Sequence, residues 1–152
     1  MPRPTLVLAA AVAATVAAPL VVTPLGAQTS SAATTAAAPA PRPSIRLRAP
    51  ANGARVAGKV TVIFGLSNYG VAPAGIDFPN AGHFHLLIDA DVPAPVTVIP
   101  TDAQHLHYGK GQIEAVVDLP KGRHVLRAVL GDHQHRVIST DLVSAPVTIT
   151  VR

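Results

Sequence analysis

Apolar and polar residues alternate along this chain from Ser44 onward, and this period of two constrains the fold more than any other feature. Side chains on a β-strand point alternately to opposite faces, so the pattern is typical of strands with one buried side. No window of a dozen residues keeps the 3.6-residue period of a helix. The clearest alternating stretches are 45–49, 60–66, 82–89, 123–130 and 147–151.

Turn-forming residues separate these stretches and favour a sandwich of two sheets. Asn52-Gly53 is a strong turn signal, and Pro120-Lys121-Gly122 predicts a hairpin that joins strands 112–119 and 123–130. The short apolar run 96–99, which has prolines on both sides, suits an edge strand at best. About seven short strands predict an all-β fold, an immunoglobulin-like or cupredoxin-like antiparallel β-sandwich, with a small open barrel as the alternative.

The beginning of the chain reads as a secretory signal peptide over residues 1–28. A basic residue precedes an apolar run, and small residues follow it, so cleavage is expected after Ala27 or after Ala32. An uncleaved membrane anchor is the alternative, although the apolar run is only about 17 residues long. Segment 29–43, rich in Ala, Thr and Pro, is expected to be a flexible linker. Residues 44–152 then form one β-sandwich domain, and the protein is expected to be periplasmic or secreted.

Composition removes several classes of function. The chain has no Cys, which excludes disulfides and thiolate metal sites, and its only Met is Met1, so thioether ligands that suit Cu(I) are missing too. Residues 44–152 carry ten basic and eight acidic side chains. The resulting net charge of +2 is too small and too scattered to favour binding to nucleic acid or to an anionic membrane surface. Contact with a membrane is expected only during export.

Six of the seven histidines form three His-x-His pairs, and these residues are the ones that suggest chemistry. Seven histidines scattered over residues 44–152 would give about 0.4 such pairs by chance. Imidazoles two residues apart on a strand lie side by side, about 6.6 Å apart, within reach of one metal ion. The pairs are His83 and His85, His105 and His107, and His133 and His135.

A metal site built from these imidazoles is the preferred interpretation. Imidazole nitrogen suits zinc, copper(II), nickel and iron, and a set without Cys or Met leans toward copper or zinc. The first two pairs are the preferred ligands, followed by the third. Asp89, Asp132 and Glu114 are candidate acceptors that would fix the imidazole tautomers. His124 alternates with Leu126, so it is expected to be a core histidine whose ring binds a backbone carbonyl.

Two other classes of function stay open. An enzyme analogous to copper–zinc superoxide dismutase, another β-sandwich with a His-x-His copper pair, lacks support because this chain has no disulfide cysteines and no bridging-histidine pattern. A structural or interaction module that binds an envelope protein or ligand without metal is the main alternative, with imidazoles that titrate near their ordinary pKa of about 6.5. No Gly-x-Ser-x-Gly elbow is present, and Gly109-Lys110-Gly111 is too short for a phosphate-binding loop. The sequence does not indicate an oligomeric state.

Five short segments carry a family resemblance. They are Pro73-Ala74-Gly75, Gly82-His83-Phe84-His85-Leu86-Leu87-Ile88-Asp89, His105-Leu106-His107-Tyr108-Gly109-Lys110-Gly111-Gln112-Ile113-Glu114, Leu119-Pro120-Lys121-Gly122-Arg123-His124-Val125-Leu126 and Gly131-Asp132-His133-Gln134-His135. Together they resemble the bacterial exported family described as domain of unknown function 4399. The resemblance implies a small periplasmic or secreted β-domain without an established activity. Members often carry three consecutive histidines where this chain has Phe84 between two, and Phe84 points away from them, so it removes no ligand.

Overall fold

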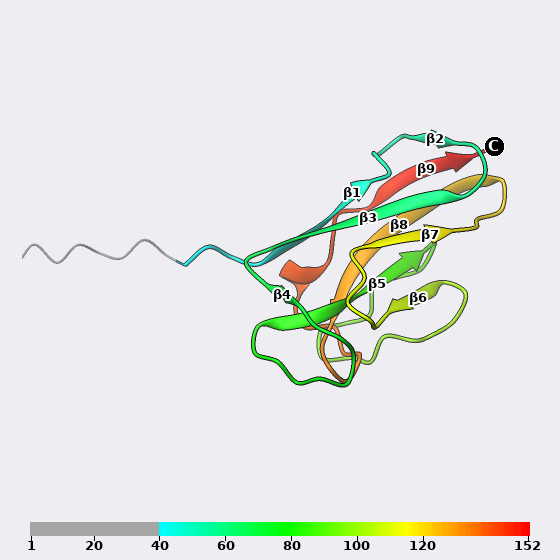
Figure 1. The fold of residues 1–152 in the computed structure, drawn as a ribbon. Coiled ribbons are helices and arrows are strands. Elements are labelled where there is room, and N and C mark those ends of the chain that lie inside the picture. Colours follow the sequence, from blue (N-terminus) through cyan, green and yellow to red (C-terminus); the bar gives the residue numbers. More distant parts are fainter. Residues whose placement is uncertain (1–39) are drawn as a thin grey trace, which may run out of the picture. The chain divides into compact units, whose positions relative to one another are not determined.

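The computed structural model describes residues 40–152. The predicted signal peptide (1–28) and most of the predicted linker (29–43) lie outside the described residues. Nine strands form two sheets (Figure 1). The three-stranded sheet has the order β1 (Ser44–Ala49), β3 (Val60–Ser67) and β7 (Glu114–Val117). The six-stranded sheet has the order β2 (Arg55–Val56), β9 (Val147–Val151), β8 (Gly122–Gly131), β5 (Ala81–Ile88) and β4 (Gly70–Val71), and β6 (His105–Tyr108) also pairs with β5.

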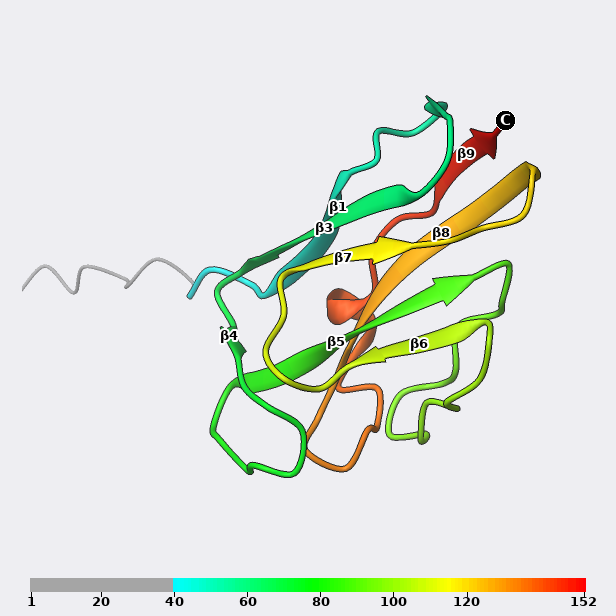
Figure 2. The same cartoon turned by 45° about the vertical axis from the view of Figure 1, so that its right-hand side comes forward.

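The two sheets face each other across the main hydrophobic core, and Figure 2 shows β3 and β7 in a different layer from β5 and β6. Phe64 of β3 stacks on Phe84 of β5 with ring centroids 4.6 Å apart. Alternate residues of β3, β5 and β8 fill this core: Val60, Val62, Phe64, Phe84, Leu86, Ile88, Leu126, Ala128 and Leu130. The predicted all-β sandwich is confirmed, and seven of its nine strands have four residues or more.

Two details of the described domain depart from a purely antiparallel sandwich of strands. The short pairings of β2 with β9 and of β4 with β5 are parallel. One 3₁₀ turn, η1 (Thr140–Leu142), is the only helical element among residues 40–152. Within those residues no helix has the length and apolar character needed to cross a membrane.

The predicted hairpin at Pro120-Lys121-Gly122 is wrong, because the two strands that it joins belong to different sheets. β7 pairs with β3, whereas β8 pairs with β5 and β9. Val117 before the turn and Leu126 after it both point into the main core, one from each sheet. The turn therefore crosses from one layer of the sandwich to the other, and local turn chemistry does not distinguish this crossing from a hairpin.

Two further segments differ from the sequence prediction. Residues 105–108, which are not among the alternating stretches of the sequence, form β6, which is hydrogen-bonded to β5. The run 96–99 is not a strand, although Val98 forms an isolated bridge with Arg136. In both cases the pairing partner is distant in the sequence, so alternation within the segment does not reveal it.

Loops cover the outer face of β5, the face that points away from the main core. Leu87 and Val129 of the sheet pack against Ile99 and Val137, which come from the segments after β5 and after β8. Backbone hydrogen bonds join the two covering segments, including one from the Val137 N–H to the Thr97 carbonyl oxygen at 3.0 Å. As a result every residue from Gly82 to Ile88 is buried.

The histidine outside the three pairs fastens the end of β5 to β8. His124 Nδ1 lies 2.7 Å from Asp89 Oδ2, and His124 Nε2 lies 2.8 Å from the Pro120 carbonyl oxygen. The Val125 N–H donates to Asp89 Oδ1 at 2.7 Å. Because both ring nitrogens face acceptors, the protonated ring fits best, and the hydrogen bond to Asp89 raises the pKa of His124. The predicted contact with a backbone carbonyl is confirmed, but the predicted place in the core is wrong, because His124 is only partly buried and is also paired with Asp89 at the end of β5.

We expect His124→Gln to remove a contribution to stability that depends on pH. Because the pKa of His124 is raised on folding, its contribution is fully present below the unfolded value of about 6.5 and is lost as the pH rises through the folded value. The substitution should lower the free energy of unfolding by about 1 kcal/mol near pH 6 and by less near pH 9. Urea unfolding followed by circular dichroism measures both values. A loss that is the same at the two pH values would contradict the protonated pair.

Candidate metal centre

Four histidines converge at one place on the outer face of the six-stranded sheet. Each offers one ring nitrogen, and these four nitrogens all lie within 4.8 Å of one another. The four are His83, His85, His107 and His135, called the histidine cluster below. Three segments that are distant in the sequence, namely β5, β6 and the loop after β8, therefore contribute side chains to one shared centre.

Strand geometry explains how three of the four meet. His83 and His85 are two residues apart on β5, so their side chains point to the same face. β6 runs antiparallel to β5 and places His107 directly opposite His85. The ring centroids of His83 and His85 are 4.9 Å apart, and those of His85 and His107 are 5.0 Å apart.

A tight turn after β8, residues 132–136, supplies the fourth imidazole. Asp132 Oδ1 accepts hydrogen bonds from the N–H groups of Gln134 and Arg136, both at 2.8 Å. The His135 N–H donates to the Asp132 carbonyl oxygen at 2.9 Å. His135 has a φ of 62°, in the left-handed region that non-glycine residues rarely adopt. Such strain persists where the surrounding structure imposes it, and it is typical of functional sites.

Two glycines make room for the imidazole rings, and the sequence prediction did not single them out. A Cβ atom at Gly131 would lie 2.9 Å from His85 Nε2. A Cβ atom at Gly109 would overlap the ring of His107. Gly131 lies on β8, a different strand from the ring above it, so no spacing rule in the sequence connects the two.

The spacing of the ring nitrogens suits ligands of a single ion. His83 Nε2 lies 3.0 Å from His85 Nε2 and 3.1 Å from His135 Nδ1. Two nitrogens bound to one ion at about 2.0–2.1 Å are themselves about 2.9–3.4 Å apart when the bond angle is between a right angle and a tetrahedral one. These two separations fall in that range, and the remaining pairs lie within 4.8 Å.

Hydrogen bonding among the described residues does not satisfy the two buried rings. The Nδ1 atoms of His83 and His85 are buried and have no partner there. An unpaired buried polar atom costs on the order of 1–3 kcal/mol. Ligating imidazoles usually donate this second N–H to an acceptor. Here the close approach of Gly131 to His85 indicates that packing fixes the ring instead. A buried polar cluster with this cost indicates a role other than stabilising the fold.

Two of the six predicted ligands lie outside the histidine cluster. His105 on β6 lies opposite Leu87 on β5, and the Nδ1 atom of His105 lies 2.8 Å from Asp102 Oδ1. His133 Nδ1 lies 3.4 Å from Asp77 Oδ1. His133 and His135 are in a turn, where residues two apart need not share a face. The structure therefore brings together both members of the first pair and one member of each other pair.

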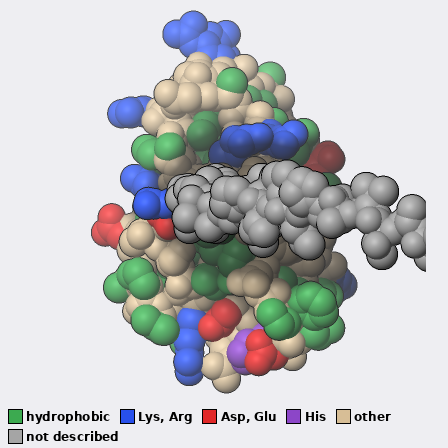
Figure 3. Space-filling view, turned by 90° about the vertical axis from the view of Figure 1, so that its left-hand side faces the viewer, with side chains coloured by type: hydrophobic (Ala, Val, Ile, Leu, Met, Phe, Trp, Pro, Cys, Tyr) green, Lys and Arg blue, Asp and Glu red, His purple; other side chains and the backbone are tan. Residues whose placement is uncertain are grey.

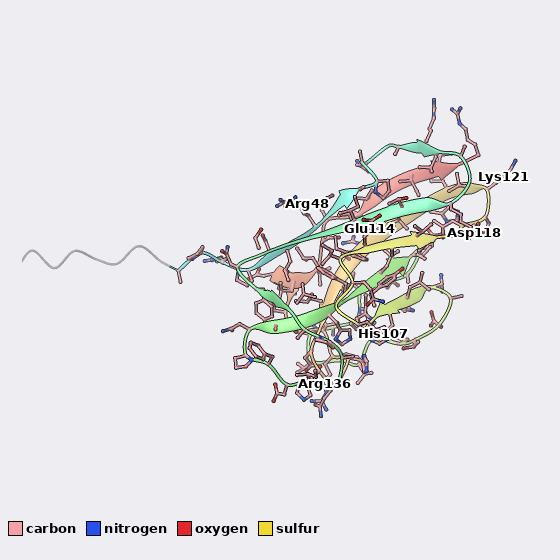
Figure 4. All side chains as sticks on the ribbon, viewed as in Figure 1. Arg48, His107, Glu114, Asp118, Lys121 and Arg136 are labelled. Atoms are coloured by element: carbon pink, nitrogen blue, oxygen red, sulfur yellow. The ribbon has the colours of Figure 1, made fainter. Side chains whose placement is uncertain are left out.

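The three predicted acceptors have other roles. Asp89 binds His124, and Asp132 accepts from backbone N–H groups of the turn that carries His135. Glu114 lies on β7 in the other sheet, and Figure 4 shows it in a different layer from His107. The prediction that these carboxylates fix the tautomers of the cluster is therefore wrong for Asp89 and Glu114, and Asp132 acts on the backbone.

The comparisons with known proteins bear on the family and not on the chemistry. A family model described as "Domain of unknown function (DUF4399)" matches residues 62–152. The chain belongs to the DUF4399 family. The resemblance inferred from the five short segments is thereby confirmed. The fibronectin(III)-like modules of Clostridium thermocellum CbhA are similar at 17% identity, over 70% of this chain and 92% of that one, with a TM-score of 0.34. No curated protein sequence matches this chain.

Three of the four imidazoles in this DUF4399 domain are neutral near pH 7. Burial, together with the neighbouring imidazoles, lowers the pKa of His83 to about 4 and that of His85 to about 3. Burial and the adjacent His135 also lower the pKa of His107. A neutral imidazole presents a free lone pair, which is the form that binds a metal ion. His83, His85 and His107 are thus held in their ligating form without any acidic ligand.

Burial differs between the two halves of the cluster. His83 and His85 are fully buried, whereas His107 and His135 are partly accessible to solvent. The cluster therefore has a rigid floor on β5 and an accessible rim formed by β6 and the turn. An ion could reach the ring nitrogens from the rim without opening the main core.

We expect the metal-free DUF4399 domain to lose stability as the pH falls below about 6.5. The pKa values of His83 and His85 are lower in the folded chain than in the unfolded one. Their contribution is fully present above the unfolded value and is lost as the pH falls toward the folded values. Replacing both by Leu should weaken this dependence. It should also leave the free energy of unfolding at pH 7 equal or higher, because two unpaired buried nitrogens are removed.

Urea unfolding in the presence of a chelator, repeated across the range from about pH 5 to pH 8, measures this dependence. His133→Leu is the matched control, because its ring lies outside the histidine cluster, and it should keep the wild-type slope. A double variant that is much less stable at pH 7 and retains the full slope would show that the cluster stabilises the fold.

Proposed function

We propose that this DUF4399 domain binds one divalent transition-metal ion, copper(II) or zinc, through the histidine cluster. The observation that carries the proposal is the convergence of four ring nitrogens within 4.8 Å of one another. The facing nitrogens of His83, His85 and His135 lie within hydrogen-bond distance of one another, but hydrogen bonds among them leave Nδ1 of His83 and of His85 buried without a partner among the described residues. One ion bound at the centre would be coordinated by all four of the facing nitrogens.

The ligand type limits the choice of metal. Neutral nitrogen donors suit copper(II) and zinc, whereas magnesium and calcium prefer oxygen ligands. Cu(I) prefers sulfur, and the chain has no Cys and no Met after Met1. A set of four imidazoles therefore favours copper(II) or zinc over magnesium, calcium and Cu(I).

The number of ligands favours binding over catalysis. Structural zinc sites are closed by four protein ligands, whereas catalytic zinc sites use three and leave one position for water. Four imidazoles would fill every position of a tetrahedral ion. Copper(II) accepts further ligands, so a superoxide-turnover assay on the copper-loaded protein tests the enzyme alternative directly. Turnover above that of free copper would favour an enzyme.

The setting that we propose is the periplasm or the outside of the cell. The basic and apolar character of residues 1–28 supports export, and the absence of Cys suits a domain that binds metal without thiolates. The partner is then the ion itself. In the alternative, an envelope protein or ligand binds without metal, and a pull-down that depends on pH and not on added metal would favour it.

We expect the purified protein to bind one equivalent of Cu(II) or Zn(II), and His83→Ala/His85→Ala to lose at least about a hundredfold in affinity. Removing two of four ligands leaves too few donors to hold the ion. Equilibrium dialysis against each ion, with bound metal measured by atomic emission, gives stoichiometry and affinity. Circular dichroism of each variant establishes that the fold is retained.

The matched control is His105→Ala/His133→Ala, which removes two imidazoles that face carboxylates outside the histidine cluster. It should bind with wild-type affinity. Equal losses in the two double variants would point to adventitious binding by surface histidines, and no loss in either would exclude the cluster as the site.

We expect Asp132→Ala to weaken metal binding by about ten- to a hundredfold, and Asp132→Asn to keep most of it. Asn retains a side-chain oxygen that can accept from the N–H groups of Gln134 and Arg136, and Ala does not. Dialysis gives the affinities, and the electron paramagnetic resonance spectrum of bound Cu(II) reports the loss of one nitrogen. Equal binding by both variants would mean that the turn does not position His135.

A further inference from the structure

A second candidate site lies beside the histidine cluster, at the start of β5. A cavity of about 300 Å³ opens there, with Ala81 in its lining. Ala81 and His83 are two residues apart on β5, so they share the outer face of the strand. The cavity and the cluster are therefore neighbours on one surface, and none of the four cluster histidines lines the cavity.

Two large and exposed apolar side chains line this cavity. Phe78 and Val96 line it although 64% and 75% of their surfaces are exposed. They are two of the seven large hydrophobic side chains that are exposed among the described residues. Figure 3 shows hydrophobic side chains on both sides of acidic groups and a histidine on one face of the molecule. Apolar surface that is left uncovered around a hollow is typical of a binding site.

The backbone at the rim is held in an unfavourable conformation. Val96 has a φ of 61° and Asn80 has a φ of 54°, and both line the cavity. Asn tolerates this region, but for a β-branched residue such as Val it is a genuine outlier. A hydrogen bond of 2.8 Å from the Val96 N–H to the Val137 carbonyl oxygen holds the chain there. The strain keeps an apolar side chain at the mouth of the cavity, where folding alone gains nothing from it.

The charged side chains of the lining are both acidic. Asp77 and Asp132 contribute carboxylates, neither Lys nor Arg lines the cavity, and the lining also includes His133, whose Nδ1 lies 3.4 Å from Asp77 Oδ1. Burial and the nearby charge of Asp132 raise the pKa of Tyr69, so its hydroxyl stays neutral at ordinary pH. Apart from this imidazole, the ionisable groups at the polar side of the cavity are the two carboxylates and the Tyr69 hydroxyl, and two aromatic rings, those of Tyr69 and Phe78, belong to its walls.

We propose that this cavity binds a compact organic cation, a protonated or quaternary amine carried on a short apolar stem. The carboxylates of Asp77 and Asp132 attract the charge, and the aromatic rings favour a cation over their faces. The apolar rim contacts the stem. The volume suits a small ligand and is at the lower end for drug-sized molecules. A free amine and a lysine side chain of a polypeptide share this chemistry.

The test is a titration of the purified protein with butyltrimethylammonium in the presence of a chelator. The chain has two Tyr and no Trp, so tyrosine emission reports on Tyr69 in the cavity and on Tyr108, which packs 5.3 Å from Phe64 in the core. We expect a saturable change in emission. Amide NMR shifts should be confined to the segments around Phe78 and Val96.

Two exposed positions give variants that should fold normally. Asp77→Asn and Phe78→Ala are each expected to weaken binding by about tenfold, because one removes a charge and the other an aromatic wall. Asp118→Asn and Val116→Ala are the matched controls, because they change an exposed carboxylate and an exposed apolar side chain that do not line the cavity. Both controls should bind as the wild type does.

Two further arms separate the sources of the cation. Tighter binding of Nα-acetyl-lysine N-methylamide than of butyltrimethylammonium would assign the cavity to a lysine side chain, and the reverse would assign it to a free ammonium compound. Either result supports the proposal. Three results would overturn the proposal. The first is that 1-butanol and butyrate change the emission as much as the cations do. The others are no saturable response to either cation up to about 10 mM, and an unchanged affinity in both cavity variants.

Discussion

The burial of β5 on both faces is the constraint on which the rest of the structure depends. Its inner side chains, among them Phe84 and Leu86, complete the main core, while its outer side chains include His83 and His85. Strands that are buried on both faces usually read as continuous apolar runs. In this strand two imidazoles take the place of two apolar residues on the outer face. Their burial costs free energy, because the described residues offer their Nδ1 atoms no acceptor.

The loops that cover this outer face act on stability and on the candidate site at the same time. Ile99 and Val137 bury Leu87, and the Ile99 N–H donates to the His135 carbonyl oxygen at 2.7 Å. The same segments therefore exclude water from the sheet and hold the turn that carries the fourth imidazole. Exclusion of water is also what lowers the pKa values of His83 and His85. The loops that bury the outer face of β5 are therefore also the loops that keep His83 and His85 neutral.

The alternation of apolar and polar residues predicted which face of a strand each side chain occupies. It did not predict which strands pair or in which register they pair. It placed Phe84 opposite its two neighbouring histidines, and the structure confirms this. It did not distinguish His107, which lies opposite His85, from His105, which lies opposite Leu87, because register is not encoded within either strand. The turn at Pro120-Lys121-Gly122 was assigned to a hairpin for the same reason. The glycine under His85 belongs to a third strand.

The turn at residues 132–136 lies between the two sites that we propose. Its Asp132 side chain lines the neighbouring cavity, and its His135 ring joins the histidine cluster. Asp132 Oδ1 already holds two backbone N–H groups of the turn, so a cation that draws this carboxylate into the cavity competes with the hydrogen bonds that position His135. A ligand can shift an equilibrium only by its difference in affinity for the two states. Because the Asp132 carboxylate serves both sites, the cation and the metal ion are expected to favour different positions of this side chain. Binding of a cation in the cavity should therefore weaken binding of a metal ion at the histidine cluster, and the reverse.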